Sequence, residues 1–241
     1  MDARCDAFLG GRVSVWQPVR GYRAGVDPVL LAAAVDARAG QAVLDLGCGV
    51  GTAALCLAAR VPGVQATGLE RNASYAALAA RNGLDVVQGD LEDMPKPLKT
   101  RSFDHVMANP PYFDRSRGAQ APNTDREEAL GEATPLTAWA TAAAKRLRPG
   151  GFAHFVHRPD RLPDLLAALS PVLGSIEVLP LSARTDRPAS LLIVRARKGG
   201  RAEFKLHFPR ILHRGLAHDA DGDDYTAEFT AIFRDAAPLA F

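Results

Sequence analysis

The chain has 241 residues, 47% of them hydrophobic and 23% charged, and its formal net charge is +2. A chain of this size and balance can bury a full α/β core, and no stretch is long and apolar enough to make it a membrane-spanning protein. The N-terminus lacks the pattern of a signal peptide and the three cysteines form no paired framework, so we expect a cytoplasmic protein without a membrane anchor.

Apolar, β-rich runs alternate along the chain with Ala- and Leu-rich helical segments. This alternation predicts an α/β protein with a mostly parallel sheet and helices on both of its faces. After a short N-terminal hairpin, helices are expected near 27–38, 52–60, 72–82, 135–148 and 160–170, and strands at 42–46, 65–70, 84–88, 103–108, 151–156, 175–180 and 189–197. Residues 112–134 are expected to form a long loop, and the tail adds a strand-like segment at 203–208 and a short helix near 225–235.

The segment VLDLGCGVGTAAL at 43–55 joins a buried strand to a helix through Gly47, Gly49 and Gly51. Glycines at this place let the backbone approach a ligand closely at the carboxyl edge of the sheet. The next strand ends in Glu70, whose carboxylate can accept hydrogen bonds from ribose hydroxyls. The third strand leads to Asp90, which can bond an adenine amino group. The pattern predicts a site for a nucleoside-containing cofactor.

Two classes of cofactor fit this geometry. Nicotinamide dehydrogenases carry the fingerprint GxGxxG, and here Thr52 stands where the last glycine would be. Asp45, two residues before Gly47, is a second departure from that fingerprint. With these residues the segment resembles the class I methyltransferases that use S-adenosylmethionine, and the resemblance covers about residues 40–198.

This resemblance implies a doubly wound, Rossmann-like fold with a seven-stranded sheet whose last strand is antiparallel. It also implies S-adenosylmethionine as the cofactor, with Asp45 and Gly47 at its methionine end, Glu70 at the ribose and Asp90 at the adenine. We expect the other two glycines of the loop, Gly49 and Gly51, to line the same site.

A second motif, Asn109-Pro110-Pro111-Tyr112, follows the predicted strand 103–108. The prolines fix the backbone, so the side-chain oxygen of Asn109 and the carbonyl of Pro110 form a rigid pair of hydrogen-bond acceptors. Such a pair suits a planar amino group and favours the pyramidal nitrogen that attacks a methyl group. Tyr112 offers its ring for stacking a planar substrate. We predict that these residues are catalytic and that Asn109 also contacts the cofactor.

Among class I methyltransferases, this motif is typical of transfer to amino nitrogens, namely adenine N6, glutamine N5 of release factors and guanine N2 of ribosomal RNA. The release-factor enzymes carry a helical domain ahead of the core, whereas only about 40 residues precede the first core strand here. The guanine-N2 enzymes often duplicate the whole domain or have Phe after the second proline. A non-catalytic, RNA-binding member of the fold is a further alternative, but it would have no use for an amino-group clamp.

The segments on either side of the core favour the adenine acceptor. The N-terminal RAGVDPVLL, which begins at Arg23 and includes Asp27, and the C-terminal GDDYTAEFTAIFRDAAPL resemble the bacterial valine-tRNA adenine-N6 methyltransferases. In that family the N-terminal segment packs over the methionine end of the cofactor, so Arg23 and Asp27 are expected there. The target is the adenosine 3′ of the anticodon. We therefore expect one methyltransferase domain, with a hairpin and helix at 1–40, a catalytic core at 41–198 and an extension at 199–241.

Basic residues predict where tRNA binds. From residue 184 to 214, nine Lys and Arg residues stand against two acidic ones, a local charge of +7. A folded tRNA requires a basic surface of this kind, although charge runs are often only solvated faces. The predicted RNA contacts are Arg115, Arg117 and Arg126 in the long loop, and Arg197, Lys198 and Arg201 in the basic stretch.

We expect no metal site from the sequence. His154 and His157 are three residues apart in a predicted strand, so their side chains should point to opposite faces of the sheet. The acidic segment HDADGDD lacks the glutamate that completes a calcium loop. Cys48 lies in the glycine loop, but methyl transfer requires no nucleophilic thiol.

Overall fold

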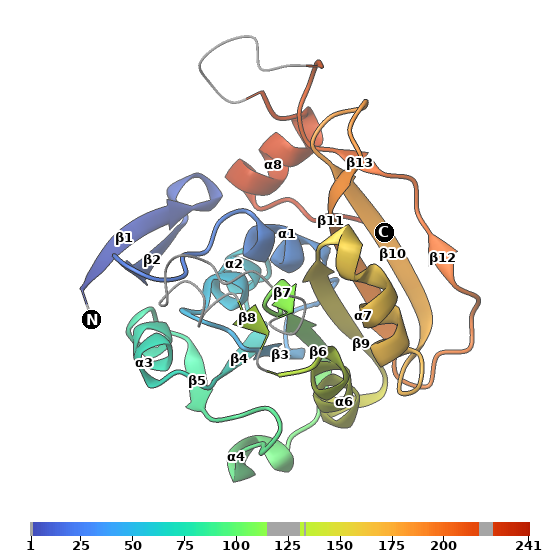
Figure 1. Cartoon of the computed structure of the whole chain (residues 1–241). Coiled ribbons are helices and arrows are strands. Elements are labelled where there is room, and N and C mark those ends of the chain that lie inside the picture. The colour runs from blue at the N-terminus through green and yellow to red at the C-terminus, as the bar shows by residue number, and fades with distance from the viewer. Residues whose placement is uncertain (1, 115–130, 133, 217–223) are drawn as a thin grey trace.

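The computed structural model describes residues 2–114, 131–132, 134–216 and 224–241. Its centre is a nine-stranded sheet in the order β12-β10-β11-β9-β6-β3-β4-β5, with β13 also paired to β10 (Figure 1). The strands are β3 (Ala42–Leu46), β4 (Gln65–Glu70), β5 (Asp85–Gln88), β6 (Phe103–Ala108), β9 (Leu147–His157), β10 (Gly174–Ser182), β11 (Ala189–Arg197), β12 (Lys205–Leu206) and β13 (Arg210–Ile211). Across the described ranges, every helix falls short of the apolar length that a bilayer requires.

The parallel strands of the sheet all end on the same side, and we call this row of carboxyl ends the active edge. Strands β3, β4, β5, β6 and β9 run parallel to one another, so their carboxyl ends meet at the same edge. β11 is antiparallel to both of its neighbours, β9 and β10, as predicted for the last strand of the core. The short strands β12 and β13 extend the sheet past the seven expected strands and run parallel to β10.

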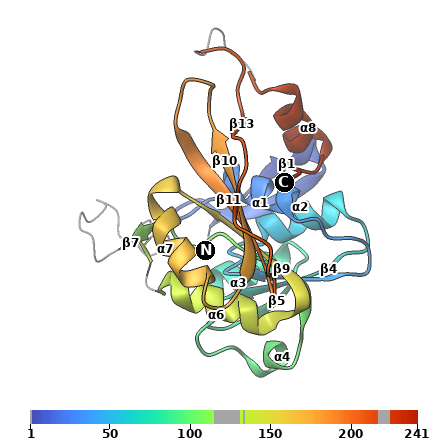
Figure 2. The ribbon, with the colours of Figure 1, turned by 90° about the vertical axis from the view of Figure 1, so that its right-hand side faces the viewer.

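Helices cover both faces of this sheet, and Figure 2 shows the two layers on opposite sides of β10 and β11. On one face lie α1 (Asp27–Ala34), α2 (Thr52–Arg60), α3 (Ala73–Arg81) and α8 (Ala227–Asp235). On the other lie α4 (Lys96–Lys99), α6 (Leu136–Arg146) and α7 (Leu162–Leu169). The hairpin of β1 (Ala3–Phe8) and β2 (Val13–Pro18) precedes α1.

Two predicted boundaries are wrong for local reasons. α1 ends at Ala34 because Val35 takes an extended backbone conformation, and the side chain of Arg60 donates to the carbonyl oxygen of Val35. α6 ends at Arg146, and β9 already begins at Leu147, which pairs with Phe103 of β6. The sequence RPGG at 148–151 therefore lies inside the strand, between the predicted end of the helix at 148 and the predicted start of the strand at 151.

Candidate active site

The loop between β3 and α2 is built on left-handed glycines. Gly47 and Gly49 have φ angles of +63° and +57°, which residues with a Cβ rarely adopt. A Cβ on Gly47 would lie 2.5 Å from Cη2 of Trp139, so the loop packs against the ring with no room for a side chain. The corresponding position on Gly49 is open. The loop thus presents bare backbone at the active edge.

Glu70 joins this loop to the end of the neighbouring strand. Its Oε2 accepts the N–H of Gly49 at 2.9 Å, and its Oε1 accepts the N–H of Asn72 at 2.7 Å. Burial raises the pKa of this carboxyl, and the two backbone donors offset part of the rise. Both oxygens face backbone groups of the active edge, where the ribose of a nucleoside was predicted to bind.

Asp45 is a buried carboxyl group beneath the glycine loop. It is 3% exposed, and its Oδ2 atom has no hydrogen-bond partner in the described part of the chain. Burial raises its pKa to about 8, a backbone hydrogen bond from Ala54 acts in the opposite direction, and nearby Glu70 adds to the rise. An unpaired buried carboxylate is costly, so a cationic or hydrogen-bond-donating ligand would satisfy it. The amino group at the methionine end of S-adenosylmethionine has this chemistry.

Asp90 lies farther along the same edge, after β5. Its Oδ1 accepts the N–H of Glu92 at 2.9 Å, and its Oδ2 lies 3.6 Å from Nη1 of Arg71. Gly51 caps α2 with a left-handed backbone, so the N-terminus of that helix faces the same region. The order β3-β4-β5 therefore brings Asp45, Glu70 and Asp90 to successive strand ends along one edge.

The Asn109-Pro110-Pro111-Tyr112 corner adjoins the glycine loop on the opposite side from Glu70. It follows β6, and Ala108 at the end of β6 pairs with Leu46 at the end of β3. Nδ2 of Asn109 lies 3.4 Å from the hydroxyl of Tyr22 and donates to it. This contact orients the amide, with its nitrogen toward Tyr22 and its oxygen on the other side.

Tyr112 is held from several directions. Its hydroxyl donates to Oδ2 of Asp27, the first residue of α1, at 2.5 Å. Its ring centroid lies 5.3 Å from that of His157, and its carbonyl accepts from Nη1 of Arg161 at 3.4 Å. Burial raises the pKa values of both Asp27 and the Tyr112 hydroxyl, and the Asp27 charge raises that of the hydroxyl further.

The structure gives the partners of two residues that were predicted at the cofactor, and it adds a third residue to the site. Asp27 was expected beside the cofactor, and its described partner is Tyr112. Arg23 was also expected there, but it pairs with Asp6 of β1 at 2.5 Å. Tyr22, which directly precedes the N-terminal motif, accepts from Asn109 through its hydroxyl, and its backbone contacts the hydroxyl of Tyr75 in α3. Burial raises the pKa of Tyr22 to about 12, so its hydroxyl stays protonated.

The predicted RNA-binding residues fall into two groups. Arg115, Arg117 and Arg126 lie outside the described residues. Arg197 pairs with Phe152 near the beginning of β9, so Arg197, Lys198 and Arg201 lie at the edge of the sheet opposite to Asn109. Two of these side chains donate to main-chain carbonyls at the start of β9, Arg197 to Gly150 at 3.0 Å and Lys198 to Leu147 at 2.7 Å.

Comparison with known proteins agrees with this geometry. The sequence profile of the methyltransferase small domain family matches residues 24–180. The tRNA1(Val) (adenine(37)-N6)-methyltransferase of Porphyromonas gingivalis (strain ATCC 33277) is 33% identical over 175 residues, which cover 66% of this chain and 68% of that protein. The enzyme of the same name from Glaesserella parasuis is 32% identical over 221 residues, 88% of this chain and 89% of that one.

The chain belongs to the tRNA1(Val) (adenine(37)-N6)-methyltransferase family. Among solved structures, a predicted O-methyltransferase from Agrobacterium tumefaciens superimposes with a TM-score of 0.73 at 25% identity, and the match covers 89% of this chain and 99% of that one. The class I methyltransferase fold expected from the glycine loop is thus confirmed.

The buried carboxyl of Asp45 predicts that the stability of the cofactor-free protein depends on pH. A pKa of about 8 in the folded protein exceeds the ordinary value of 3.8, so unfolding releases a proton between these two values. Stability should fall as the pH rises from 5 to 8, by up to about 1.4 kcal/mol per pH unit. Asp45→Asn should reduce this slope in denaturant titrations and leave the smaller contributions of Glu70 and Asp27, whereas Asp93→Asn, at a side chain that is 93% exposed, should keep the slope of the parent. Parallel slopes for the parent and Asp45→Asn would contradict the burial argument.

The contact between Tyr112 and Asp27 predicts the effect of a second substitution. Tyr112→Phe removes the hydroxyl and leaves a mostly buried carboxyl oxygen without its donor. We expect the free energy of unfolding to fall by about 1–3 kcal/mol. Urea titration measures the change, and a midpoint equal to that of the parent would show that the hydroxyl contributes nothing to stability.

Proposed function

We infer that this chain transfers a methyl group from S-adenosylmethionine to the N6 amino group of an adenine in tRNA, and that the acceptor is the adenosine 3′ of the anticodon of valine tRNA. The observation that carries the proposal is the position of Asn109-Pro110-Pro111-Tyr112 directly beside the glycine loop, at adjacent strand ends. Membership of the family supports the tRNA acceptor.

The residues present fit S-adenosylmethionine. Asp45 offers an unpaired buried oxygen, Gly49 offers open backbone, and Glu70 ends the strand where ribose hydroxyls can bind. We propose that Asp45 and Gly47 hold the methionine end, Glu70 the ribose and Asp90 the adenine. The bound cofactor supplies an electrophilic methyl group on a sulfonium.

The corner would prepare the acceptor nitrogen. An adenine amino group is a weak nucleophile because its lone pair is delocalised into the ring. In this proposal the oxygen of Asn109 and the carbonyl of Pro110 accept its two N–H groups and favour a pyramidal nitrogen, whose lone pair then points at the methyl group. The ring of Tyr112 stacks on the base. No general base is required, since the product nitrogen loses its proton to water after transfer.

The N- and C-terminal segments complete this arrangement. The contact of Tyr112 with Asp27 joins the N-terminal segment to the core, and Phe229 and Ile232 of α8 belong to the same apolar cluster as α1. We propose that residues 1–40, 41–198 and 199–241 work as one methyltransferase domain. Because tRNA is its substrate, we also propose that the protein acts in the cytoplasm.

The acceptor can be identified directly. Incubating the protein with tritiated S-adenosylmethionine and unmodified tRNA transcripts, followed by nucleoside analysis, should give N6-methyladenosine in valine tRNA. Release factors and ribosomal RNA serve as competing acceptors in parallel reactions. Label in glutamine or in guanine-N2 instead of adenine would overturn the proposed acceptor and leave the cofactor assignment standing.

A substitution at the corner separates chemistry from binding. Asn109→Ala removes one acceptor that acts on the reacting amino group, so we expect turnover to fall by about 10²–10³-fold. Affinity for S-adenosylmethionine, measured by calorimetry, should stay close to that of the parent. A large loss of affinity with normal turnover at saturation would assign Asn109 to the cofactor alone.

Salt dependence tests the proposed tRNA contacts of the basic stretch. Arg197 and Arg201 are exposed at the opposite edge, so tRNA would have to extend along the sheet to reach them. Replacing both with Ala should flatten the slope of log K against log salt by about 1.4–1.8, because each phosphate contact contributes about 0.7–0.9. Turnover at saturating tRNA should be unchanged. An unchanged slope would leave basic residues at the active edge, such as Arg187 in the turn between β10 and β11, as the better candidates.

A further inference from the structure

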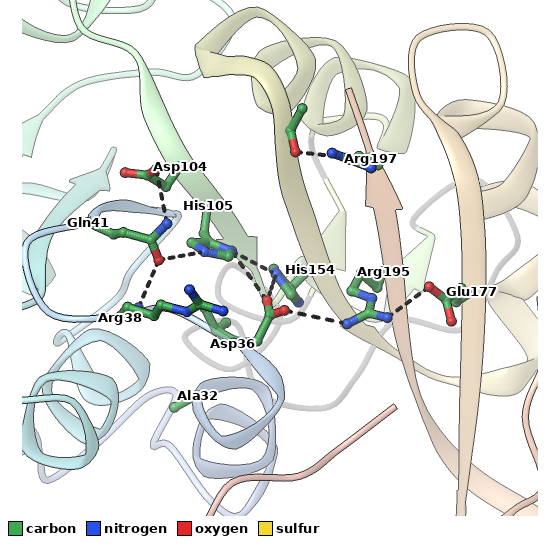
Figure 3. Close-up of polar contacts among 12 residues, drawn as sticks. Ala32, Asp36, Arg38, Gln41, Asp104, His105, His154, Glu177, Arg195 and Arg197 are labelled. Carbon is green, nitrogen blue, oxygen red and sulfur yellow. Dashed lines mark hydrogen bonds and ion pairs between the residues drawn. The ribbon is translucent and has the colours of Figure 1, made fainter. Parts of the chain in front are cut away.

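Two buried histidines and an aspartate meet on the α1 face of the sheet, away from the active edge. His105 lies on β6, His154 on the neighbouring β9, and Asp36 follows α1 (Figure 3). Nδ1 of His105 is 3.2 Å from Nε2 of His154, and Oδ1 of Asp36 lies 3.7 Å from the first atom and 3.9 Å from the second. Three potential metal ligands from three parts of the fold therefore converge on one point.

The distances among the three potential ligand atoms resemble those among the ligands of one metal ion. A tetrahedral zinc ion with bonds of about 2.0–2.1 Å separates its ligands by about 3.3–3.4 Å. The three observed separations of 3.2, 3.7 and 3.9 Å lie close to this value. An ion could therefore bind here after shifts of a few tenths of an ångström in each side chain.

The neighbours of His105 set its tautomer. The amide oxygen of Gln41 accepts the N–H of Arg38 at 2.8 Å, and the amide nitrogen of Gln41 donates to Asp104 at 3.2 Å, so the amide has one orientation. The oxygen lies 3.3 Å from Nε2 of His105 and accepts its N–H. The proton of neutral His105 is thus on Nε2, and the lone pair of Nδ1 points toward His154 and Asp36. Histidine ligands of metal ions are commonly oriented by such an outer hydrogen bond.

Asp36 is oriented by an ion pair with Arg195, and its side chain is open to solvent. Nη1 of Arg195 lies 3.8 Å from Oδ2 of Asp36, which leaves Oδ1 toward the histidines, and the charge of Arg195 is balanced by Glu177 at 2.8 Å (Figure 3). The side chain of Asp36 is 55% exposed, whereas those of His105 and His154 are 5% and 0% exposed. An ion can therefore enter from the side of Asp36 and keep a water molecule there.

We propose that Asp36, His105 and His154 form a binding site for one divalent transition-metal ion of the zinc class, with water as a further ligand. Two imidazoles and a carboxylate are the ligand types that such ions prefer. The site lies below the active edge, at the opposite end of α1 from Asp27. Its role is to fasten the end of α1 to β6 and β9, and the ion takes no part in methyl transfer. The sequence alone does not predict this site because its three ligands lie far apart in the chain and meet only when β6, β9 and the end of α1 pack together.

The experiment uses the whole chain, freed of metal by chelation. Titration with cobalt(II) should give the visible absorption bands of a protein-bound ion with nitrogen ligands, saturating at one equivalent, and zinc should displace it. Asp36→Asn removes the exposed ligand without disturbing the buried pair, and we expect it to weaken cobalt and zinc binding by about tenfold or more. Asp160→Asn, at a side chain that is 63% exposed in another part of the surface, is the matched control and should bind like the parent.

Zinc should also raise the melting temperature of the parent and of Asp160→Asn more than that of Asp36→Asn. His105→Asn provides a second ligand variant, and circular dichroism shows whether it folds. The absence of cobalt bands, or equal metal affinity in the parent and Asp36→Asn, would overturn the proposal and leave His105 and His154 as a hydrogen-bonded pair that shares one proton. Failure of tRNA methylation would not bear on this result, because metal binding is measured without substrate.

Discussion

The hydrogen bond between Tyr112 and Asp27 is the contact on which the geometry of the active edge depends. It connects the corner after β6 to the first turn of α1, between residues that are 85 positions apart in the chain. Because both groups are largely withdrawn from water, neither can be left without its partner at low cost. The contact therefore fixes the ring of Tyr112 and the N-terminal segment that carries Tyr22 at the same time.

The parallel sheet supplies the second constraint. Pairing of β3 with both β4 and β6 places the glycine loop between Glu70 on one side and Asn109 on the other. A cofactor held by the glycine loop and an acceptor held by the corner must then meet at adjacent strand ends. Tyr22 contacts elements on both sides of the glycine loop, since its hydroxyl accepts from Asn109 after β6 and its backbone contacts the hydroxyl of Tyr75 in α3, the helix that follows β4. Arg197, Lys198 and Arg201 lie at the opposite edge of the sheet and are remote from this junction.

The sequence predicted those strands whose bounds are set by the pattern of neighbouring residues. The bounds of β3, β4, β6 and β11 match the expected strands because each is a short, mostly buried segment bounded by turn residues, whether it runs parallel or antiparallel to its neighbours. The start of β9 at Leu147 was not predicted because Pro149, Gly150 and Gly151 are residue types that are uncommon inside strands. The partners of Asp27, Arg23 and His154 could not be predicted, since each lies on a segment distant in sequence and depends on how α1 and the hairpin pack against the core.

A double-mutant cycle tests most directly whether the contact between Asp27 and Tyr112 assembles the site. Turnover for tRNA methylation is measured for the parent, for Asp27→Ala, for Tyr112→Phe and for the protein with both substitutions. Either change breaks the same hydrogen bond, so the account predicts that each single variant is slowed and that the double variant is no slower than the worse of the two. Losses that multiply in the double variant would show that the two residues act independently and would contradict the account.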